Sequence, residues 1–326
     1  MLILGIETSC DETAAALVEN GRKVLSSVIH SQIAIHQPYG GVVPEIASRS
    51  HVERIDGVVA MALREAGKSL EEIDGVAVTQ GPGLIGPLLV GLNYAKGLSY
   101  GLNKPLYAIH HLDGHVAANY LAFPELEPPF LALILSGGHS HFYLTEDYGQ
   151  YKLLGGTRDD ALGEAFDKVA RILGLAYPGG PRVEEIAKRG QGVFALPKAM
   201  LEKGSLDFSF SGIKSAVKNL ADKLELSEKE KADLAASFQE RVFSIVRDKL
   251  LEALEQTGQK KLIIAGGVAS NQRLRQVLKD IPAQVFIPPL SICTDNGAMI
   301  GAAGYYKALK GDIAPLSLNA KANLPL

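Results

Sequence analysis

Two histidines spaced four residues apart are the strongest candidates for chemistry in this sequence. His111 and His115 follow the strand-like run PLYAI (105–109). On a helix, residues i and i+4 share one face, so both imidazoles could bind one metal ion. Asp295 is the best candidate for a third ligand because it precedes a predicted helix of small residues. A structural or solvent-exposed pair is the alternative, and on chemistry alone three more histidines compete: His110, His139 and His141.

Two glycine-rich loops each follow an apolar run that is typical of a buried strand. One is SGGH (136–139), and the other begins at Gly266 and Gly267, with Asn271 four residues later at the start of a predicted helix. Because glycine has no side chain, the backbone N–H groups of such loops can approach phosphate oxygens closely. A simple hairpin turn or strand-to-helix connection is the alternative for each loop.

A third polar loop, TSCDET (8–13), joins the apolar runs LILGI (2–6) and AAALV (14–18). Its carboxylates, Asp11 and Glu12, could hold a cation beside a phosphate group. Carboxylates in turns are also commonly solvated or act as helix caps. Since all three polar loops follow a strand, we expect them to converge on one nucleotide cleft.

An acidic helical stretch offers one further candidate. Glu164 and Asp167 lie in the amino-terminal part of a predicted helix, where acidic side chains interact favourably with the helix dipole. Asp167 also precedes the loop PGGP (178–181), in which a ribose or an amino-acid group could be hydrogen-bonded.

The elements that must position these residues alternate between strands and helices. The strand, loop, strand order at 2–18 returns at 131–144, which indicates a duplicated architecture. Helical patterns at 44–67, 85–101, 163–173 and 234–254 favour an α/β fold with two related lobes. We place the domain boundary in the proline-rich FPELEPPF segment. The predicted domains are 1–125 and 126–326, with the last helix packing back on the first domain.

Composition limits the classes of protein that remain. The 326 residues carry a net charge of −3, so no overall basic field indicates a nucleic-acid binder, and any RNA must be bound locally or with partners. Two cysteines cannot build a disulfide framework, and no apolar run is long enough to cross a bilayer. We therefore expect a cytoplasmic protein that has no contact with membranes.

Nine blocks of sequence, taken together, resemble the universal tRNA N6-adenosine threonylcarbamoyltransferase family, formerly called O-sialoglycoprotein endopeptidase-like, in its bacterial TsaD type. The resemblance covers nearly the whole chain, in the order and spacing of that family. The blocks are GIETSCDET (5–13), GGVVPEIASRSH (40–51), QGPGLIGPLLVG (80–91), HHLDGH (110–115), SGGH (136–139), GEAFDKVARILGLAYPGGP (163–181), FSFSGIK (208–214), GGVASN (266–271) and CTDNGAMIG (293–301).

The resemblance implies a two-lobed fold of the actin, sugar-kinase and heat-shock ATPase type, with duplicated ribonuclease-H-like halves. It also implies one divalent metal ion, iron or zinc, on His111, His115 and Asp295. The substrate-binding residues that it implies are Ile134, Leu135, Ser136, Gly137, Gly138, Asp167, Gly180 and Asn271. Glu184 stands where some relatives carry aspartate. The glycine-rich loops complete the predicted substrate-binding set with His139, Gly266 and Gly267.

The implied reaction transfers a threonylcarbamoyl group from threonylcarbamoyl-AMP to the N6 amine of the adenosine beside the anticodon of tRNA. In this hypothesis the metal binds oxygens of the donor, the SGGH loop holds the leaving phosphate, and Asp11 or Glu12 orients the amine or accepts its proton. ATP is a second candidate nucleotide. The partners implied by the family are tRNA, an inactive actin-fold paralogue and a small P-loop ATPase.

Three other functions remain open on the sequence alone. A small-molecule kinase on the same fold would leave the histidine pair without a role. A metallopeptidase is disfavoured because Leu112 stands where the H-E-x-x-H motif has its glutamate. A non-catalytic nucleotide-sensing scaffold would tolerate the loss of Asp295, whereas a transferase should not.

Overall fold

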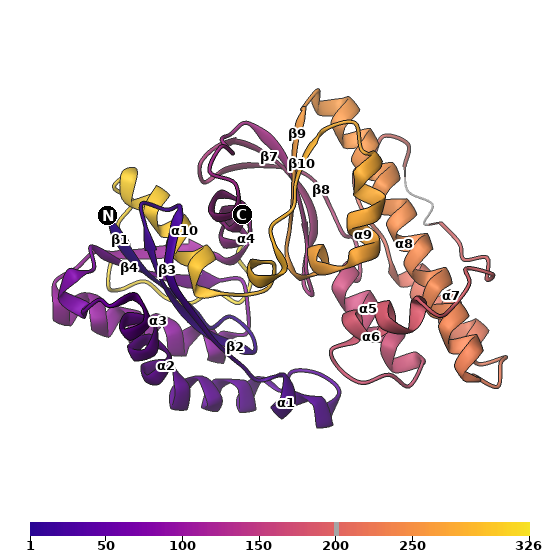
Figure 1. The fold of residues 1–326 in the computed structure, drawn as a ribbon, viewed down its shortest axis with the longest axis horizontal. Helices are drawn as coiled ribbons and strands as arrows, with labels where there is room; N and C mark the ends of the chain where they lie inside the picture. Colours follow the sequence, from indigo (N-terminus) through magenta and orange to yellow (C-terminus); the bar gives the residue numbers. More distant parts are fainter. Residues whose placement is uncertain (199–201) are drawn as a thin grey trace. The chain divides into compact units, whose positions relative to one another are not determined.

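The chain forms two compact units (Figure 1), and the computed structural model describes residues 1–198 and 202–326. Unit 1 comprises Met1–Pro128, Asp147–Gln150 and Pro288–Leu326, and unit 2 comprises Pro129–Glu146 and Tyr151–Ile287. The sequence-based division into domains 1–125 and 126–326 stays a prediction, because compactness alone does not define domains that fold independently.

Unit 1 is built on a five-stranded sheet in the order β3-β2-β1-β4-β5. On one side of β1, strand β2 pairs antiparallel with β1, and β3 pairs antiparallel with β2. On the other side, β4 pairs parallel with β1, and β5 pairs parallel with β4. Their bounds are β1 Leu2–Glu7, β2 Glu12–Glu19, β3 Lys23–Ser31, β4 Gly75–Gly81 and β5 Leu106–His110. All six residues of β1 are buried, which explains the continuous apolar run that marks this strand in the sequence.

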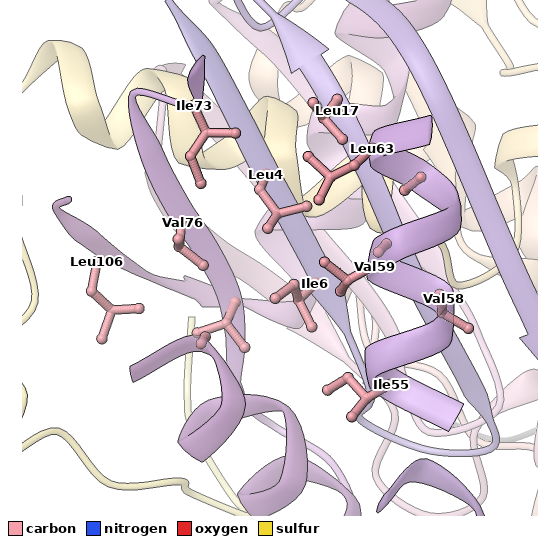
Figure 2. Close-up of a cluster of buried hydrophobic side chains, with 14 of the residues drawn as sticks. Leu4, Ile6, Leu17, Ile55, Val58, Val59, Leu63, Ile73, Val76 and Leu106 are labelled. Carbon is pink, nitrogen blue, oxygen red and sulfur yellow. The ribbon is translucent and has the colours of Figure 1, made fainter. Parts of the chain in front are cut away.

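Side chains of β1 alternate between two covered faces of this sheet. Leu4 and Ile6 belong to an apolar cluster with Ile55 and Val59 of α2 (Pro44–Ala66), as Figure 2 shows. Helix α3 (Ile85–Leu102) covers the same face, contributing Leu92 and Ala95 to the cluster. The other face carries α10 (Gly297–Leu309) and α4 (His111–Ala122). Because alternate residues of a strand share a face, Ile3, Gly5 and Glu7 point toward α10 and α4.

Helix α10 packs on β1 through a stripe of glycines. A Cβ atom on Gly301 would meet the Val18 side chain, and one on Gly304 would lie 2.5 Å from Ala77 Cβ and 3.2 Å from Ile3. Gly297 would meet the backbone of Ala15 and Ala16. The small residues of GAMIGAAG therefore allow the helix backbone to lie directly against the sheet.

In its described residues, unit 2 has a five-stranded sheet in the order β10-β9-β6-β7-β8. Strand β6 pairs with β7 antiparallel and with β9 parallel, as β1 pairs with β2 and β4 in unit 1. Read from β8, the order matches that of unit 1 read from β3, which confirms the predicted duplication. The bounds are β6 Phe130–Leu135, β7 Ser140–Asp147, β8 Gln150–Gly156, β9 Lys261–Ala265 and β10 Gln284–Phe286.

Helices complete the two units. Those of unit 2 are α5 Leu162–Ile172, α6 Gly179–Ala187, α7 Ser211–Ala221, α8 Glu228–Thr257 and α9 Gln272–Val277, while unit 1 adds the short α1 Ile33–His36. Short 3-10 helices span Gln37–Tyr39, Leu70–Glu72, Gly267–Ser270, Leu278–Asp280 and Leu290–Ile292. Among residues 1–198 and 202–326, every helix is too short or too polar to span a bilayer.

Candidate functional site

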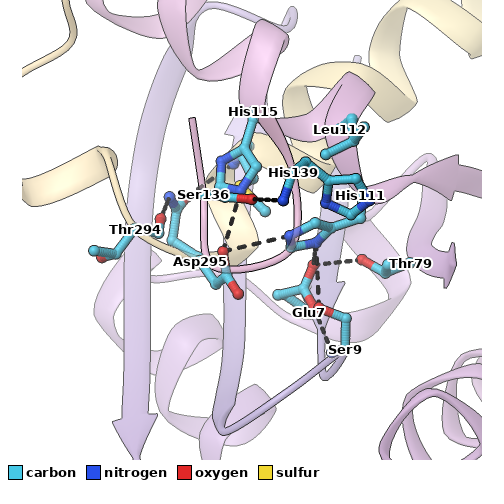
Figure 3. Close-up of polar contacts among 12 residues, drawn as sticks. Glu7, Ser9, Thr79, His111, Leu112, His115, Ser136, His139, Thr294 and Asp295 are labelled. Atoms are coloured by element: carbon cyan, nitrogen blue, oxygen red, sulfur yellow. Dashed lines mark hydrogen bonds and ion pairs between the residues drawn. The ribbon is translucent and has the colours of Figure 1, made fainter. Parts of the chain in front are cut away.

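The three predicted metal ligands lie together in unit 1. Nε2 of His111 is 3.5 Å and Nε2 of His115 is 3.3 Å from Oδ1 of Asp295. The two imidazole rings are 4.7 Å apart and nearly perpendicular. One nitrogen from each histidine and one carboxylate oxygen all lie within 4.8 Å of one another. Figure 3 shows both rings directed at Asp295.

Local structure explains how the ligands meet. Helix α4 begins at His111, so His115 follows one turn later on the same face. The preceding residue, His110, caps this helix by accepting the Leu112 N–H at Nδ1, and its Nε2 donates to the carbonyl of Leu324. Burial lowers the pKa of His110 to about 4, and its two hydrogen bonds fix a neutral ring. His110 therefore acts as the cap of α4. The other two competing histidines, His139 and His141, belong to unit 2.

The third ligand is fixed by the start of α10. Asn296 caps this helix by accepting the Met299 N–H at 2.9 Å, and Asp295 is the residue directly before that cap. Helix α10 packs against α4, where Met299 and Ile300 surround Gly114. The contact between the two helices thus brings Asp295 to the histidine pair, although about 180 residues separate it from His115 in the sequence.

The surroundings of His115 fit a bound metal ion. The residue is 1% exposed, and neither ring nitrogen has a hydrogen-bond partner within residues 1–198 and 202–326. Nε2 faces Asp295 at 3.3 Å, but the contact does not have hydrogen-bond geometry. A buried polar atom without a partner is costly, and a metal ion at Nε2 would satisfy it. Two imidazoles and one carboxylate are also ligands that suit zinc and iron.

Glu7, at the end of β1, contacts one of the predicted metal ligands and was not among the residues predicted from the sequence. Its carboxylate is completely buried and accepts hydrogen bonds from the Ser9 backbone N–H and from Thr79 Oγ1 at 2.6 Å. His111 Nδ1 lies 3.2 Å from Glu7 Oε2 and 3.2 Å from Ser9 Oγ. The signal in the sequence is a carboxylate at the end of a fully apolar strand, where an unpaired charge would be unstable.

Charges in this cluster are strongly coupled. Burial alone would lower the pKa of His111, but the carboxylates of Asp295 and Glu7 outweigh it and raise the pKa to about 9. Burial would likewise raise the pKa of Glu7, and His111 reverses the direction so that this pKa is lowered. In the metal-free protein at neutral pH, a protonated His111 therefore balances the two carboxylates.

Of the two predicted catalytic residues, only Asp11 lies in the loop after β1, because Glu12 is already the first residue of β2. His51 Nε2 donates to the carbonyl of Cys10 at 2.9 Å, and its Nδ1 lies 2.7 Å from Thr13 Oγ1. Glu12 accepts a hydrogen bond from the Ser31 hydroxyl. Burial, followed by repulsion from Asp11, raises the pKa of Glu12 to about 9. The adjacent carboxylates of Asp11 and Glu12 therefore do not ionise independently, because the charge of Asp11 disfavours the charged form of Glu12.

The predicted loop of unit 2 at residues 136–139 follows β6. Ile134 and Leu135 are the last two residues of β6 and are fully buried, so the exposed part of this loop begins after them. The turn is closed by the Ser136 N–H, which donates to the His139 carbonyl, and by the His139 N–H, which donates to Ser136 Oγ. A Cβ atom on Gly137 or Gly138 would meet no other atom within 4 Å.

The second glycine-rich loop lies at the same edge of the sheet, because β6 and β9 are parallel neighbours. Gly266 has a φ of +88°, and a Cβ atom there would lie 2.4 Å from the Leu135 carbonyl oxygen, so a side chain cannot be accommodated. A Cβ atom on Gly267 would meet no neighbouring atom within 4 Å. Asn271 caps α9 through its Oδ1 and donates from Nδ2 to Gln239.

The remaining predicted residues of unit 2 are linked to these loops. Asp167 accepts the Gly179 N–H at 2.7 Å, and Glu184 accepts the Gln272 N–H at 2.8 Å, one residue after Asn271. A Cβ atom on Gly180 would meet no other atom within 4 Å. The structure thus brings the predicted substrate-binding residues of unit 2 to the carboxyl ends of β6 and β9 and the helices beside them.

Comparison with known proteins gives a match over most of the sequence. The family model described as "TsaD: tRNA N6-adenosine threonylcarbamoyltransferase" matches residues 23–302. A protein of that name from Clostridium perfringens (strain SM101) is 53% identical over 332 residues, which cover 100% of this chain and 98% of the relative. Relatives of the same name from Clostridium novyi (strain NT) and Clostridium botulinum (strain Kyoto) are 52% and 51% identical, each over 99% of this chain and 97% of their own length.

Solved structures with a similar fold are distant in sequence. Full-length HypF, in a phosphate- and nucleotide-bound form, has a TM-score of 0.61 at 15% identity over 94% of this chain and 46% of its own. Component A of (R)-2-hydroxyglutaryl-CoA dehydratase from Acidaminococcus fermentans has a TM-score of 0.55 at 15% identity, covering 95% and 99%. A ROK family protein from Streptococcus pneumoniae TIGR4 has a TM-score of 0.54 at 13% identity, covering 96% and 99%. These similarities concern the fold alone, and they confirm the predicted actin-like and sugar-kinase-like class.

Proposed function

The chain belongs to the tRNA N6-adenosine threonylcarbamoyltransferase family, and we propose that it transfers the threonylcarbamoyl group from threonylcarbamoyl-AMP to the N6 amine of the adenosine beside the anticodon of tRNA. Family membership rests on the match over residues 23–302 and on relatives that are more than half identical over at least 97% of their own length. The observation that carries the proposal within the structure is the convergence of His111, His115 and Asp295.

We propose that these three side chains hold one iron or zinc ion, with both histidines binding through Nε2. When bound, such an ion supplies a Lewis acid that polarises an oxygen of the acyl donor. The protein's contribution is rigidity, because both histidines are buried in α4 and Asp295 directly precedes the cap of α10. The carboxylate of Asp295 remains about one quarter exposed, which leaves access to the site.

The two predicted proton acceptors, Asp11 and Glu12, form a coupled pair. Burial and the charge of Asp11 raise the pKa of Glu12 to about 9. We propose that one carboxylate of this pair accepts the proton of the adenosine amine while the other shares a proton by hydrogen bonding. The bond from His51 to the carbonyl of Cys10 holds this loop in place.

We propose that the nucleotide part of the donor is bound in unit 2. Gly137, Gly138, Gly180 and Gly267 all leave space that a Cβ atom would occupy, as a backbone site for phosphate and ribose requires. Asp167, Glu184 and Asn271 already bond to backbone or side-chain groups of unit 2. These three residues would therefore shape the loops as well as contact the ligand.

Transfer RNA must present an unstacked adenine, a mode of recognition that is common for bases in RNA loops. Because the net charge of the chain is −3, we propose that partner proteins supply part of the tRNA-binding surface. An inactive actin-fold paralogue and a small P-loop ATPase are the partners that we propose, and ATP is a second nucleotide to test.

The decisive experiment supplies purified protein with threonylcarbamoyl-AMP labelled in its threonine part and with unmodified tRNA, alone and with candidate partners. We expect labelled threonylcarbamoyladenosine in the tRNA with wild type and with His30→Ala, a histidine of β3 outside the cluster. His111→Ala and Asp295→Ala should form less than about one hundredth as much, because each removes a proposed ligand. Folded wild-type protein that modifies no tRNA with any partner would contradict the proposal.

A further inference from the structure

We propose that Glu7 is a positioning residue for the metal ligand His111: its carboxylate accepts the Nδ1–H of that ring and thereby leaves Nε2 available for the metal ion. The inference rests on the proposed metal site. It assigns a role to a carboxylate that faces Nδ1 of His111, whereas Asp295 faces Nε2 of the same ring.

The position of Glu7 follows from the alternation of side chains along β1. Gly5 faces α10, so Glu7, two residues later, points to the same side, on which α4 carries His111. On the adjacent parallel strand, Thr79 follows Val78, the partner of Ile6, and donates its hydroxyl to Glu7 Oε2. The carboxylate is completely buried, so protein groups must meet all of its hydrogen-bonding needs.

The hydrogen-bond donors around Glu7 determine which ring nitrogen of His111 carries the proton. The Ser9 N–H and the Thr79 hydroxyl both donate to Glu7, which is consistent with an ionised carboxylate that only accepts. Nδ1 of His111, 3.2 Å from Oε2, must then be the donor. In the neutral, metal-binding form of the ring, the single proton stays on Nδ1 and the lone pair of Nε2 points toward Asp295.

His115 provides an internal contrast. Among the residues that the structure describes, none hydrogen-bonds to its buried Nδ1, so none of them selects its tautomer. The two histidines of the pair are therefore unequal, and His111 is the one whose orientation is imposed before an ion binds. Groups that orient a metal-bound histidine in this way typically contribute a factor of 10 to 100 in metal affinity.

A role for Glu7 as a fourth ligand does not fit the arrangement. Its oxygens face Nδ1 of His111, whereas the ligand atoms that converge on Asp295 are the Nε2 atoms of the two histidines. In the described residues, the group able to hold one ion consists of His111, His115 and Asp295. Glu7 acts through His111.

The test measures zinc affinity by competition with a chromophoric chelator, in wild type and in Glu7→Gln, which keeps the shape but removes the charge. We expect zinc binding to weaken by roughly 10- to 100-fold in Glu7→Gln. Asp74→Asn is the matched control, because Asp74 accepts the Leu2 N–H at the other end of the same strand. Its zinc affinity should equal that of wild type. A folded Glu7→Gln variant that binds zinc within twofold of wild type would overturn the inference.

A second measurement is independent of whether that variant folds. Long-range ¹H–¹⁵N correlation spectra of zinc-loaded wild type should show His111 protonated at Nδ1 and bound to metal through Nε2. Binding of zinc through Nδ1 would overturn the inference. If wild type bound no zinc at all, the proposed metal site itself would fail and the inference with it, whereas zinc binding that is insensitive to Glu7 would remove the inference alone.

Discussion

Gly5 on β1 and Gly301 on α10 approach so closely that a Cβ atom on Gly5 would lie 2.3 Å from the Gly301 backbone nitrogen and 2.2 Å from the carbonyl oxygen of Gly297. The contact joins backbone to backbone, so no change of side-chain rotamer can relieve a clash. Asp295 directly precedes α10 and Glu7 ends β1. This contact therefore sets how the elements that carry the candidate metal site lie against one another.

Gly5→Ala should destabilise the protein, because the added methyl group must push α10 away from the sheet. Overpacking of a rigid core typically costs about 1–3 kcal/mol, and we expect the upper part of that range in urea unfolding. Gly97→Ala in α3 is the matched control, since a Cβ atom there would meet nothing within 4 Å. That change should stabilise the protein by up to about 1 kcal/mol. Equal unfolding midpoints for the two variants would contradict the packing argument.

Asp295→Asn should abolish metal retention and tRNA modification while leaving the metal-free fold intact. The substitution keeps the size of the side chain but replaces a charged ligand with an amide, which binds zinc or iron poorly. Metal content after gel filtration and transfer activity with labelled donor measure the two effects. Asp295→Asn protein that keeps its metal and its activity would favour a nucleotide-sensing scaffold instead.

Stability of the metal-free protein should fall as pH rises from 6.5 to 9. Burial lowers the pKa of His111, but Asp295 and Glu7 outweigh it and raise the folded-state pKa to about 9, above the ordinary value of 6.5. Stabilisation by protonated His111 is thus fully present below pH 6.5 and is lost as pH rises through 9. Urea unfolding in the presence of a chelator should show a smaller decline for His111→Gln than for wild type. The argument fails if the two proteins lose stability in parallel.

Gly180→Ala should raise the KM for threonylcarbamoyl-AMP by more than about tenfold without changing the unfolding midpoint. A Cβ atom at this second residue of α6 meets no neighbouring protein atom within 4 Å. A rise in KM would therefore come from a clash with the bound nucleotide and not from a change in the fold. Gly212→Ala, at the second residue of α7, is equally unobstructed and should leave KM unchanged. Equal KM values for both variants would place the nucleotide away from Gly180.

Much of the fold could be predicted because the signals are local. Strand β6 and helices α2 and α3 begin and end within one residue of the expected bounds, since Pro44 starts α2 and Gly67 ends it. Helix α8 is longer than its apolar pattern, because Ser227 and Glu230 form a capping box before the first buried residue. The duplication was also predictable, because the strand, loop, strand pattern at the start of each half recurs in the sequence.

The features of the site that could not be predicted from the sequence depend on contacts between distant residues. Glu7 meets Thr79, 72 positions later, and His111, 104 positions later, and no spacing rule links these residues. The raised pKa of Glu12 likewise depends on burial, which composition does not show. Asn271 was predicted from its family motif as a substrate contact, and only the folded chain shows that its side chain also caps α9 and bonds to Gln239.

Unit 1 is built from segments at both ends of the chain, so it can be completed only after most of the chain has been synthesised. Both histidines are synthesised early, but Asp295 and α10 leave the ribosome only after the whole of unit 2 has been made. Until then, the α10-facing side of the nascent sheet, with Ile3 and Gly5, lacks its covering helix and presents apolar surface that chaperones recognise. Such a late, long-range closure is slow. Capture of a metal ion by all three ligands would therefore mark a chain whose synthesis and folding are complete.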